Sequence, residues 1–137
     1  MKVLIDTNII LDILLARIPF IVPSVQLVQM IENGQIKAYV TANSITDIVY
    51  VARKKFSFVE IRRIILDLLN QINIIGVYRE DILEAFNLGF SDFEDALQSA
   101  CSEKEQIDFI VTRNKKDFTN SKVTALDIAD FLAKYYR

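Results

Sequence analysis

The sequence predicts an α/β fold, with a central parallel sheet and helices on both faces. Short apolar runs of strand length alternate along the 137-residue chain with longer segments of helical periodicity. No hairpin signal joins two of the strand-like runs, so each strand must reach the next through a helix, which makes the two parallel. The hydrophobic content of 52% is enough to bury both faces of such a sheet.

Each strand is expected where a short apolar run ends at a polar residue or a turn. The first run, 2–5, ends at Asp6 and is typical of a buried parallel strand. The other strands are expected at residues 36–41, 72–77, 109–112 and 123–126.

The segments between these strands repeat apolar residues at helical spacing. Gly34 and Gly89 follow two of them, as is typical of helix C-termini. Helices are expected over residues 8–17, 23–33, 43–55, 57–71, 80–88, 91–104 and 127–136. No linker, repeat or low-complexity tract interrupts the pattern, so we expect residues 1–137 to form one domain.

The composition excludes several kinds of chemistry. The chain has no histidine, which excludes His-based acid–base catalysis, Ser-His or Cys-His nucleophile pairs and His-ligated metals. The single cysteine, Cys101, excludes an intrachain disulfide and a Cys-based zinc site, and we expect it to be a small buried residue. The net charge of −2 argues against a protein that coats DNA. Catalysis here must rest on carboxylates, amides, hydroxyls, lysine or arginine.

No segment is expected to direct the chain into or across a membrane. Residues 1–15 are largely apolar, but Asp6, Asn8 and Asp12 interrupt them, unlike the apolar stretch of an export signal. No apolar run reaches the roughly 18 residues that a membrane span needs. We therefore expect the protein to act in the cytoplasm.

Acidic and amide side chains follow several of the predicted strands. Parallel strands end at one edge of the sheet, and ligands bind beyond their carboxyl ends. Four separate segments deliver Asp or Asn to this edge, which is the most informative feature of the sequence. The candidate catalytic residues are Asp6, Asp47, Asp92, Asp95, Asn114 and Asp117.

Each of these residues also has a purely structural interpretation. Asp6 can cap the following helix, although Thr7 and Asn8 can do so equally well, and its place after an apolar strand favours a buried functional carboxylate. The local pattern around Asp47 fits a surface position as well as a functional one. Asn114 can cap the turn that follows it.

The segment Ser91-Asp-Phe-Glu-Asp95 opens a helix. Ser91 and Glu94 match the capping-box pattern, which predicts a structural role for Glu94. Asp92 then lies in the first turn, where the helix dipole favours an anion. Asp95 shares its helix face, and two like charges there are easier to explain if a cation lies between them. Asp117 can in turn pair with its neighbouring lysines.

A set of carboxylates without histidine or cysteine suits a hard divalent cation. Mg²⁺ and Mn²⁺ take oxygen ligands and usually keep several waters. In two-metal sites, ions about 3.5–4 Å apart clamp the attacking and leaving oxygens of a phosphodiester. The expected metal ligands are Asp6, Asp47, Asp92 and Asp95.

Four segments resemble the PIN-domain nucleases, a family that includes the VapC-like toxins of bacterial toxin–antitoxin pairs. They are VLIDTNIILDIL at 3–14, VTANSITDIVYVARKK at 40–55, SDFEDALQSAC at 91–101 and IVTRNKKDF at 110–118. Their order and spacing are those of the family, and the DFEDALQ form resembles one branch of it. The resemblance implies a single PIN-like domain, an Mg²⁺- or Mn²⁺-dependent endoribonuclease activity, an RNA substrate, an antitoxin partner and a homodimer.

The resemblance also assigns roles residue by residue. Asp6 corresponds to the first family acid and Asp95 to the third, while Asp92 is an added acid of this branch. Asn8 and Thr112 are expected to orient the side chains that bind the metal.

Two positions depart from the family pattern. Asp47 stands where the family usually has Glu, and Asn114 stands where it often has Asp, with Asp117 three residues later as an acid that can replace the lost charge. These departures leave open a non-catalytic PIN-like module that holds RNA or a protein. The third alternative is a phosphotransfer receiver-like domain, but the pair Asp92 and Asp95 at the start of a helix fits it poorly.

Binding of RNA phosphates requires cations. Arg113, Lys115 and Lys116 border the acidic residues in sequence and are expected to bind RNA. The runs 53–55 and 62–63 are further basic segments, of which the second is expected to be an ordinary solvated face. Association with other chains is expected through the helix 57–71 and the C-terminal apolar residues, and Tyr50 and Phe58 are expected in the core or in a dimer contact. The C-terminal residues are Phe131, Leu132 and Tyr135.

Overall fold

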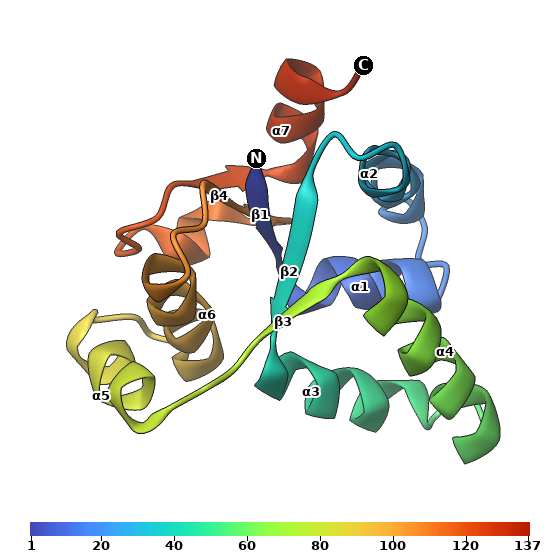
Figure 1. The fold of residues 1–137 in the computed structure, drawn as a ribbon, viewed down its shortest axis with the longest axis horizontal. Helices are drawn as coiled ribbons and strands as arrows, with labels where there is room; N and C mark the ends of the chain where they lie inside the picture. Colours follow the sequence, from blue (N-terminus) through green and yellow to red (C-terminus); the bar gives the residue numbers. More distant parts are fainter.

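The computed structural model describes residues 1–137 and contains a five-stranded sheet with helices on both faces (Figure 1). The strand order is β3-β2-β1-β4-β5, and every neighbouring pair is parallel. The predicted α/β class and the helix-connected parallel sheet are confirmed. No helix of the structure combines the length and the apolar character needed to cross a bilayer.

The order of elements follows the prediction. The strands are β1 (Lys2–Ile5), β2 (Lys37–Thr41), β3 (Asn73–Ile75), β4 (Phe109–Thr112) and β5 (Ala125–Asp127). The helices are α1 (Thr7–Leu14), α2 (Ile21–Glu32), α3 (Ala42–Ala52), α4 (Phe58–Gln71), α5 (Arg79–Asn87), α6 (Phe93–Lys104) and α7 (Ile128–Tyr135), with a 3₁₀ turn, η1 (Lys115–Phe118), after β4.

Several elements are shorter than the apolar pattern predicts. Strand β3 pairs only with β2, from Tyr39↔Asn73 to Thr41↔Ile75. Because β2 ends at Thr41, where α3 begins, the apolar residues beyond Ile75 have no strand to pair with. Helix α1 ends at Leu14, before Ala16 adopts a φ of 49° that an α-helix does not allow.

Side chains of the central strands alternate between two cores. Val3 and Ile5 of β1 face a core shared with α1, α2 and α7. Leu4 faces the opposite core, which contains α5, α6 and the buried Cys101. Both faces of the central strands β1, β2 and β4 are therefore covered, whereas the edge strands β3 and β5 are partly open to solvent.

Some expectations about surface and core are wrong. Phe131 and Leu132 lie in the core with 0% and 8% exposure, so neither forms an association surface. They face inward because α7 packs its apolar side against the sheet. Tyr50 and Phe58 are exposed, at 55% and 78%, so the core alternative is wrong for both and the dimer contact stays a prediction.

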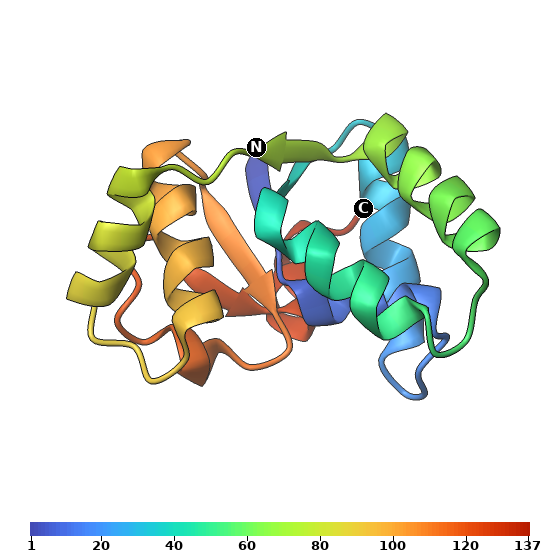
Figure 2. The same cartoon turned by 90° about the horizontal axis from the view of Figure 1, so that it is seen from below.

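The carboxyl ends of the strands meet at the edge where the helices α1 and α3 begin. Figure 2 views the molecule from below, with α3 and α6 on either side of this edge. The predicted site residues follow these strand ends, so the fold brings together segments that are far apart in sequence.

Candidate active site

A polar pocket of about 420 Å³ lies at this edge, among α1, α3, α6 and η1. Six of its lining residues are acidic, and none is lysine or arginine. The acidic residues are Asp6, Asp47, Asp92, Glu94, Asp95 and Asp117. Five of the six predicted catalytic residues thus share one pocket, together with one acid, Glu94, that the sequence had assigned to helix capping.

Asp6 is the most buried of these acids, with 5% exposure. It stands at the N-cap position of α1, but its side chain makes no capping hydrogen bond. Instead, Thr112 Oγ1 donates to Asp6 Oδ2 at 2.8 Å and Gln98 Nε2 donates to Asp6 Oδ1 at 3.2 Å. Burial raises the pKa of Asp6 above its ordinary value, although these two hydrogen bonds oppose the rise. The carboxylate is thus oriented by β4 and α6 rather than used as a helix cap.

Gln98 is a site residue that sequence reasoning missed. It lies on α6 three residues after Asp95 and four after Glu94, and its side chain is buried. This spacing places it on the same helix face as the two acids, so the pattern contained a signal for it.

A chain of buried hydroxyl groups joins the starts of α1 and α3 beside the pocket. Thr7 Oγ1 donates to Ser44 Oγ at 2.8 Å, and Ser44 Oγ lies 2.9 Å from Thr41 Oγ1. Asp47 follows Ser44 by about one helical turn and is half-buried. The hydroxyl contacts therefore fix the helix that presents Asp47 to the pocket.

The predicted capping box at Ser91 and Glu94 is not formed. Helix α6 begins one residue later, with Asp92 as its N-cap, and Asp92 Oδ1 accepts a hydrogen bond of 2.9 Å from the backbone N–H of Asp95. Glu94 is therefore free of capping and turns into the pocket against Asp47. Burial and the neighbouring Asp47 raise the pKa of Glu94 to about 7, so Glu94 is partly protonated near neutral pH.

The surroundings of Asp95 disfavour the ionised form of its carboxyl group. Burial and the nearby charges of Asp6, Asp92, Asp117 and Glu94 raise the pKa of Asp95 to about 7. The pairing of Asp92 with Asp95 at the start of α6 is explained without a cation, because the Asp92 carboxylate accepts a hydrogen bond from the backbone N–H of Asp95.

Asn114 and Asp117 have different roles: Asn114 caps η1, and Asp117 lines the pocket. Asn114 Oδ1 accepts a hydrogen bond from the backbone N–H of Lys116 and caps η1, and Asn114 is not among the residues that line the pocket. Asp117 does line it, and it forms no ion pair with the adjacent lysines. Asn8 also lines the pocket but is exposed and orients none of the acids through its side chain, whereas Thr112 holds Asp6.

The basic residues next to the acids are largely engaged elsewhere. Arg113 Nε lies 3.3 Å from the fully buried Asp12, and its guanidinium stacks 4.2 Å from the ring centre of Phe20. Arg17 approaches the same Asp12 carboxylate at 3.5 Å. Arg113 therefore joins η1 to α1 and to the loop after α1. Lys115 pairs with Asp130, while Lys116 is exposed and unpaired.

The pocket suits a divalent cation by its donor set. Hard carboxylate oxygens converge from four separate segments, and these are the ligands that Mg²⁺ and Mn²⁺ prefer. As the side chains stand, no three acidic groups come close enough together to hold one ion. Cation binding would therefore need some of these side chains to move closer together.

Comparison with known proteins supports this description of the fold. A family model described as PIN domain matches residues 2–116. No curated protein sequence gives a significant match.

Several solved structures share the fold. The structure of VapBC2 from Rickettsia felis bound to a promoter DNA fragment matches with a TM-score of 0.69 and 14% identity, over 93% of this chain and 98% of that chain. A toxin–antitoxin complex from Klebsiella pneumoniae matches with a TM-score of 0.69 and 20% identity, over 92% and 97%. VapBC-1 from nontypeable Haemophilus influenzae matches with a TM-score of 0.69 and 14% identity, over 94% and 99%.

Proposed function

The chain belongs to the PIN-domain family, and on this premise we propose that it is a metal-dependent endoribonuclease of the cytoplasm, the toxin of a toxin–antitoxin pair. The observation that carries the proposal is the pocket in which six carboxylates gather without a lysine or arginine among them. A stable protein does not collect like charges in one half-buried place without a compensating role, because each raises the free energy of the others.

The residues that would hold Mg²⁺ or Mn²⁺ are Asp6, Asp47, Asp92 and Asp95. Such a cation, when bound, supplies positive charge for the scissile phosphate and lowers the pKa of an attacking water, so no histidine base is needed. Thr112 and Gln98 hold both oxygens of Asp6 in a fixed orientation.

Removal of divalent metal is expected to stop RNA cleavage. The purified protein should cut single-stranded RNA in Mg²⁺ or Mn²⁺, lose this activity in EDTA and regain it when metal is restored. Gel analysis of a labelled oligoribonucleotide measures the cleavage. The Asp95→Asn protein, purified in parallel, controls for a contaminating nuclease. Cleavage that continues in EDTA contradicts the mechanism. If the protein binds metal and RNA but does not cleave, the result favours the non-catalytic module that Asp47 and Asn114, which differ from the family pattern, left open.

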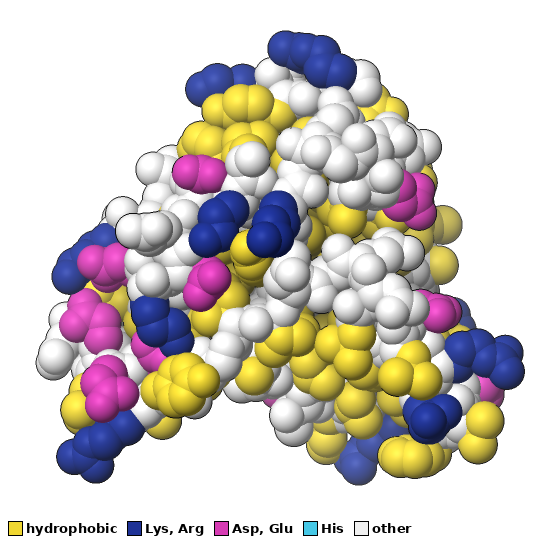
Figure 3. Space-filling view, viewed as in Figure 1, with side chains coloured by type: hydrophobic (Ala, Val, Ile, Leu, Met, Phe, Trp, Pro, Cys, Tyr) yellow, Lys and Arg dark blue, Asp and Glu magenta, His cyan; other side chains and the backbone are white.

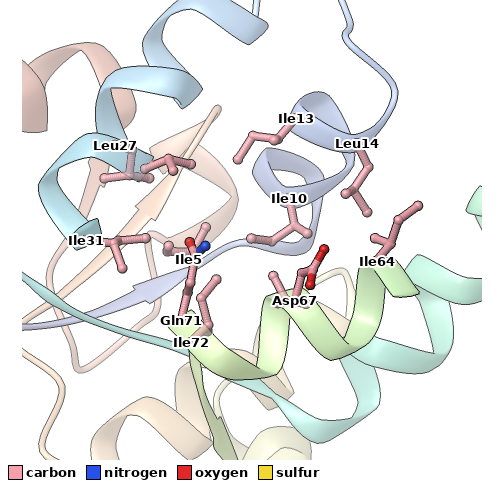
Figure 4. A pocket seen from close by; sticks show the side chains of 12 residues that line it. Ile5, Ile10, Ile13, Leu14, Leu27, Ile31, Ile64, Asp67, Gln71 and Ile72 are labelled. Carbon is pink, nitrogen blue, oxygen red and sulfur yellow. The ribbon is translucent and has the colours of Figure 1, made fainter. Parts of the chain in front are cut away.

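We propose that the protein partner, an antitoxin, covers an apolar groove in which Ile5 at the end of β1 lies among the surrounding helices. The groove lies among α1, α2 and α4, has a cavity of about 280 Å³, and ten of its twelve lining residues are hydrophobic. Figure 4 shows Ile10, Ile13, Leu27 and Ile64 around it.

The outer side of α4 extends this apolar surface. Phe58 and Val59 are exposed there, next to Arg62 and Arg63. Figure 3 shows hydrophobic side chains gathered over α3 and α4, with basic side chains beside them. A helix with one apolar face and flanking acidic residues fits both features.

A second copy of the chain is proposed to associate through α5. Leu83 and Phe86 of this helix are exposed, and the ring of Phe86 lies 4.6 Å from that of the exposed Phe93. This cluster is separate from the groove, so a dimer leaves the groove open to the antitoxin.

Expression of the protein alone is expected to arrest growth, and co-expression of a small protein encoded beside it should restore growth. The double variant Arg62→Glu with Arg63→Glu should weaken antitoxin binding.

The proposed association of two copies predicts a species larger than the 15.7 kDa chain in analytical ultracentrifugation. A strictly monomeric protein that is harmless when expressed alone contradicts both proposed partners.

A further inference from the structure

We infer that Tyr50 of α3 and Arg53, the residue that caps the C-terminus of this helix, form a nucleotide-binding rim at the mouth of the acidic pocket. A base of single-stranded RNA stacks on the Tyr50 ring, and an adjoining phosphate pairs with the Arg53 guanidinium. The inference rests on the proposed function and names the residues that hold the substrate beside the acids.

The rim is a preformed pair of an aromatic ring and a cation. Tyr50 lines the acidic pocket, and 55% of the residue is exposed. The Arg53 guanidinium lies 4.1 Å from the centre of its ring, and Lys54 Nζ lies 6.0 Å from it. The ring has no role in the core, so its exposed surface is available to a ligand. Single-stranded nucleic acids bind to this combination, because every base has a face that stacks and every linkage carries a charge.

The spacing along α3 connects the rim to the acids. Asp47, Tyr50 and Arg53 follow one another at intervals of three residues, and Arg53, the C-cap, keeps right-handed helical backbone angles, so each lies next to the previous one on the helix surface. Each interval advances about 4.5 Å along the helix axis. A carboxylate of the pocket, an aromatic ring and a cation thus form a row that leads outward from the pocket. A strand with its phosphate at the acids can place a neighbouring base on the ring and the next phosphate on the guanidinium.

The charge distribution supports the same surface. The pocket itself contains no basic residue, so a polyanion needs cations at its margin. Arg113 pairs with Asp12 and Lys115 pairs with Asp130, so fewer free cations remain in and beside η1 to bind phosphates. Residues 53–55 are the one run of three consecutive basic residues in the chain, and all three are exposed and free of ion pairs.

RNA binding by variants in an Asp95→Asn background, which is expected to bind without cleaving, tests the rim. Fluorescence anisotropy with a labelled single-stranded oligoribonucleotide in Mg²⁺ is the measurement. Tyr50→Ala should weaken binding about 10-fold and Tyr50→Phe should restore it, because stacking needs the ring and not the hydroxyl. Arg53→Ala should weaken binding and lower the slope of log Kd against log salt concentration by about 0.7, the value for one phosphate of a single strand. Tyr50→Ala should leave that slope unchanged.

A matched control is Tyr78→Ala. Tyr78 is also exposed and also carries a cation over its ring, Lys104 at 4.8 Å, but it lies beside the C-terminal end of α6 and does not line the pocket. Its replacement should not change RNA affinity. In the chain that retains Asp95, Tyr50→Ala should raise KM about 10-fold with little change in kcat, which a general loss of structure would not do.

The outcomes separate the rim from the proposed function. If the wild type cleaves RNA and Tyr50→Ala binds as tightly as its parent, the rim is wrong and the nuclease proposal stands. If Tyr50→Ala changes only the sedimentation of the protein, Tyr50 belongs to a contact between copies and the rim is overturned. If binding depends on Tyr50 but the wild type does not cleave, the rim stands and the nuclease proposal fails. Absence of any RNA binding overturns both.

Discussion

Replacing Asp6 or Asp95 with asparagine is expected to lower the rate of RNA cleavage by more than about 100-fold, since even residues that merely support metal ligands cost about 10–100-fold when changed. Asparagine keeps the size of the side chain but removes its negative charge. Asp6 is held by Thr112 and Gln98 at the floor of the pocket, and Asp95 enters it from the first turn of α6. Either change leaves one fewer carboxylate for a divalent cation.

Cleavage of a labelled single-stranded RNA at saturating Mg²⁺ measures the effect. Asp67→Asn is the matched control, because Asp67 is an exposed acid of α4 that does not line the acidic pocket. It should cleave at the wild-type rate. An Asp95→Asn protein that cleaves as fast as the wild type removes Asp95 from the set of ligands.

The order and the parallel arrangement of the elements could be predicted from local patterns. Strand-length apolar runs, helical periodicity and the glycines at positions 34 and 89 all describe the chain near one point in sequence. Both glycines adopt a positive φ, as a helix C-terminus requires. The extent of β3 could not be predicted, because it depends on where its partner β2 ends.

The start of α6 shows why one site residue was misassigned. In the segment Ser91-Asp-Phe-Glu-Asp95, either Ser91 or Asp92 can serve as the N-cap, and each has an acidic residue three positions later. Local sequence does not distinguish these two choices. The structure begins the helix with Asp92, and this shift of one residue turns Glu94 by about 100° relative to a helix capped by Ser91. Glu94 consequently faces Asp47 in the pocket.

Arg113 illustrates a different limit. Its neighbours in sequence predict a role in RNA binding, whereas its guanidinium contacts Asp12 and Phe20, which precede it by more than ninety residues. A buried carboxylate such as Asp12 requires cations near it. Sequence periodicity reveals that Asp12 belongs to a helix, but not which arginines reach it.

Asp95→Asn is also expected to raise the melting temperature of the protein in EDTA while it removes most of the stabilisation by Mg²⁺. The pKa of Asp95 is raised to about 7 from an ordinary value of 3.8, because burial and the charges of Asp6, Asp92, Asp117 and Glu94 disfavour its ionised form. The folded state therefore binds more protons than the unfolded state between these two pH values. Stability in EDTA should fall as the pH rises from about 4 to about 7 and then level off.

The asparagine variant carries no charge at this position, so it should lose this part of the pH dependence and melt about 2–5 °C higher than the wild type at pH 7.5 in EDTA. Saturating Mg²⁺ should stabilise the wild type by mass action, on the order of 1–3 kcal/mol. In the variant the pocket has one fewer carboxylate, and the shift with Mg²⁺ should be small. Asp67→Asn should behave like the wild type in both conditions.

Thermal melts of the wild type and Asp95→Asn, recorded between pH 4 and pH 8 with EDTA and with Mg²⁺, separate this interpretation from a purely local one. If Asp95 acts only as a favourable charge in the first turn of α6, its replacement lowers the melting temperature in EDTA, because the helix N-terminus loses an anion. The metal-induced shift would then persist in the variant. The two interpretations thus predict opposite signs for the same measurement, and an apo variant less stable than the wild type with an intact Mg²⁺ shift would exclude Asp95 as a metal ligand.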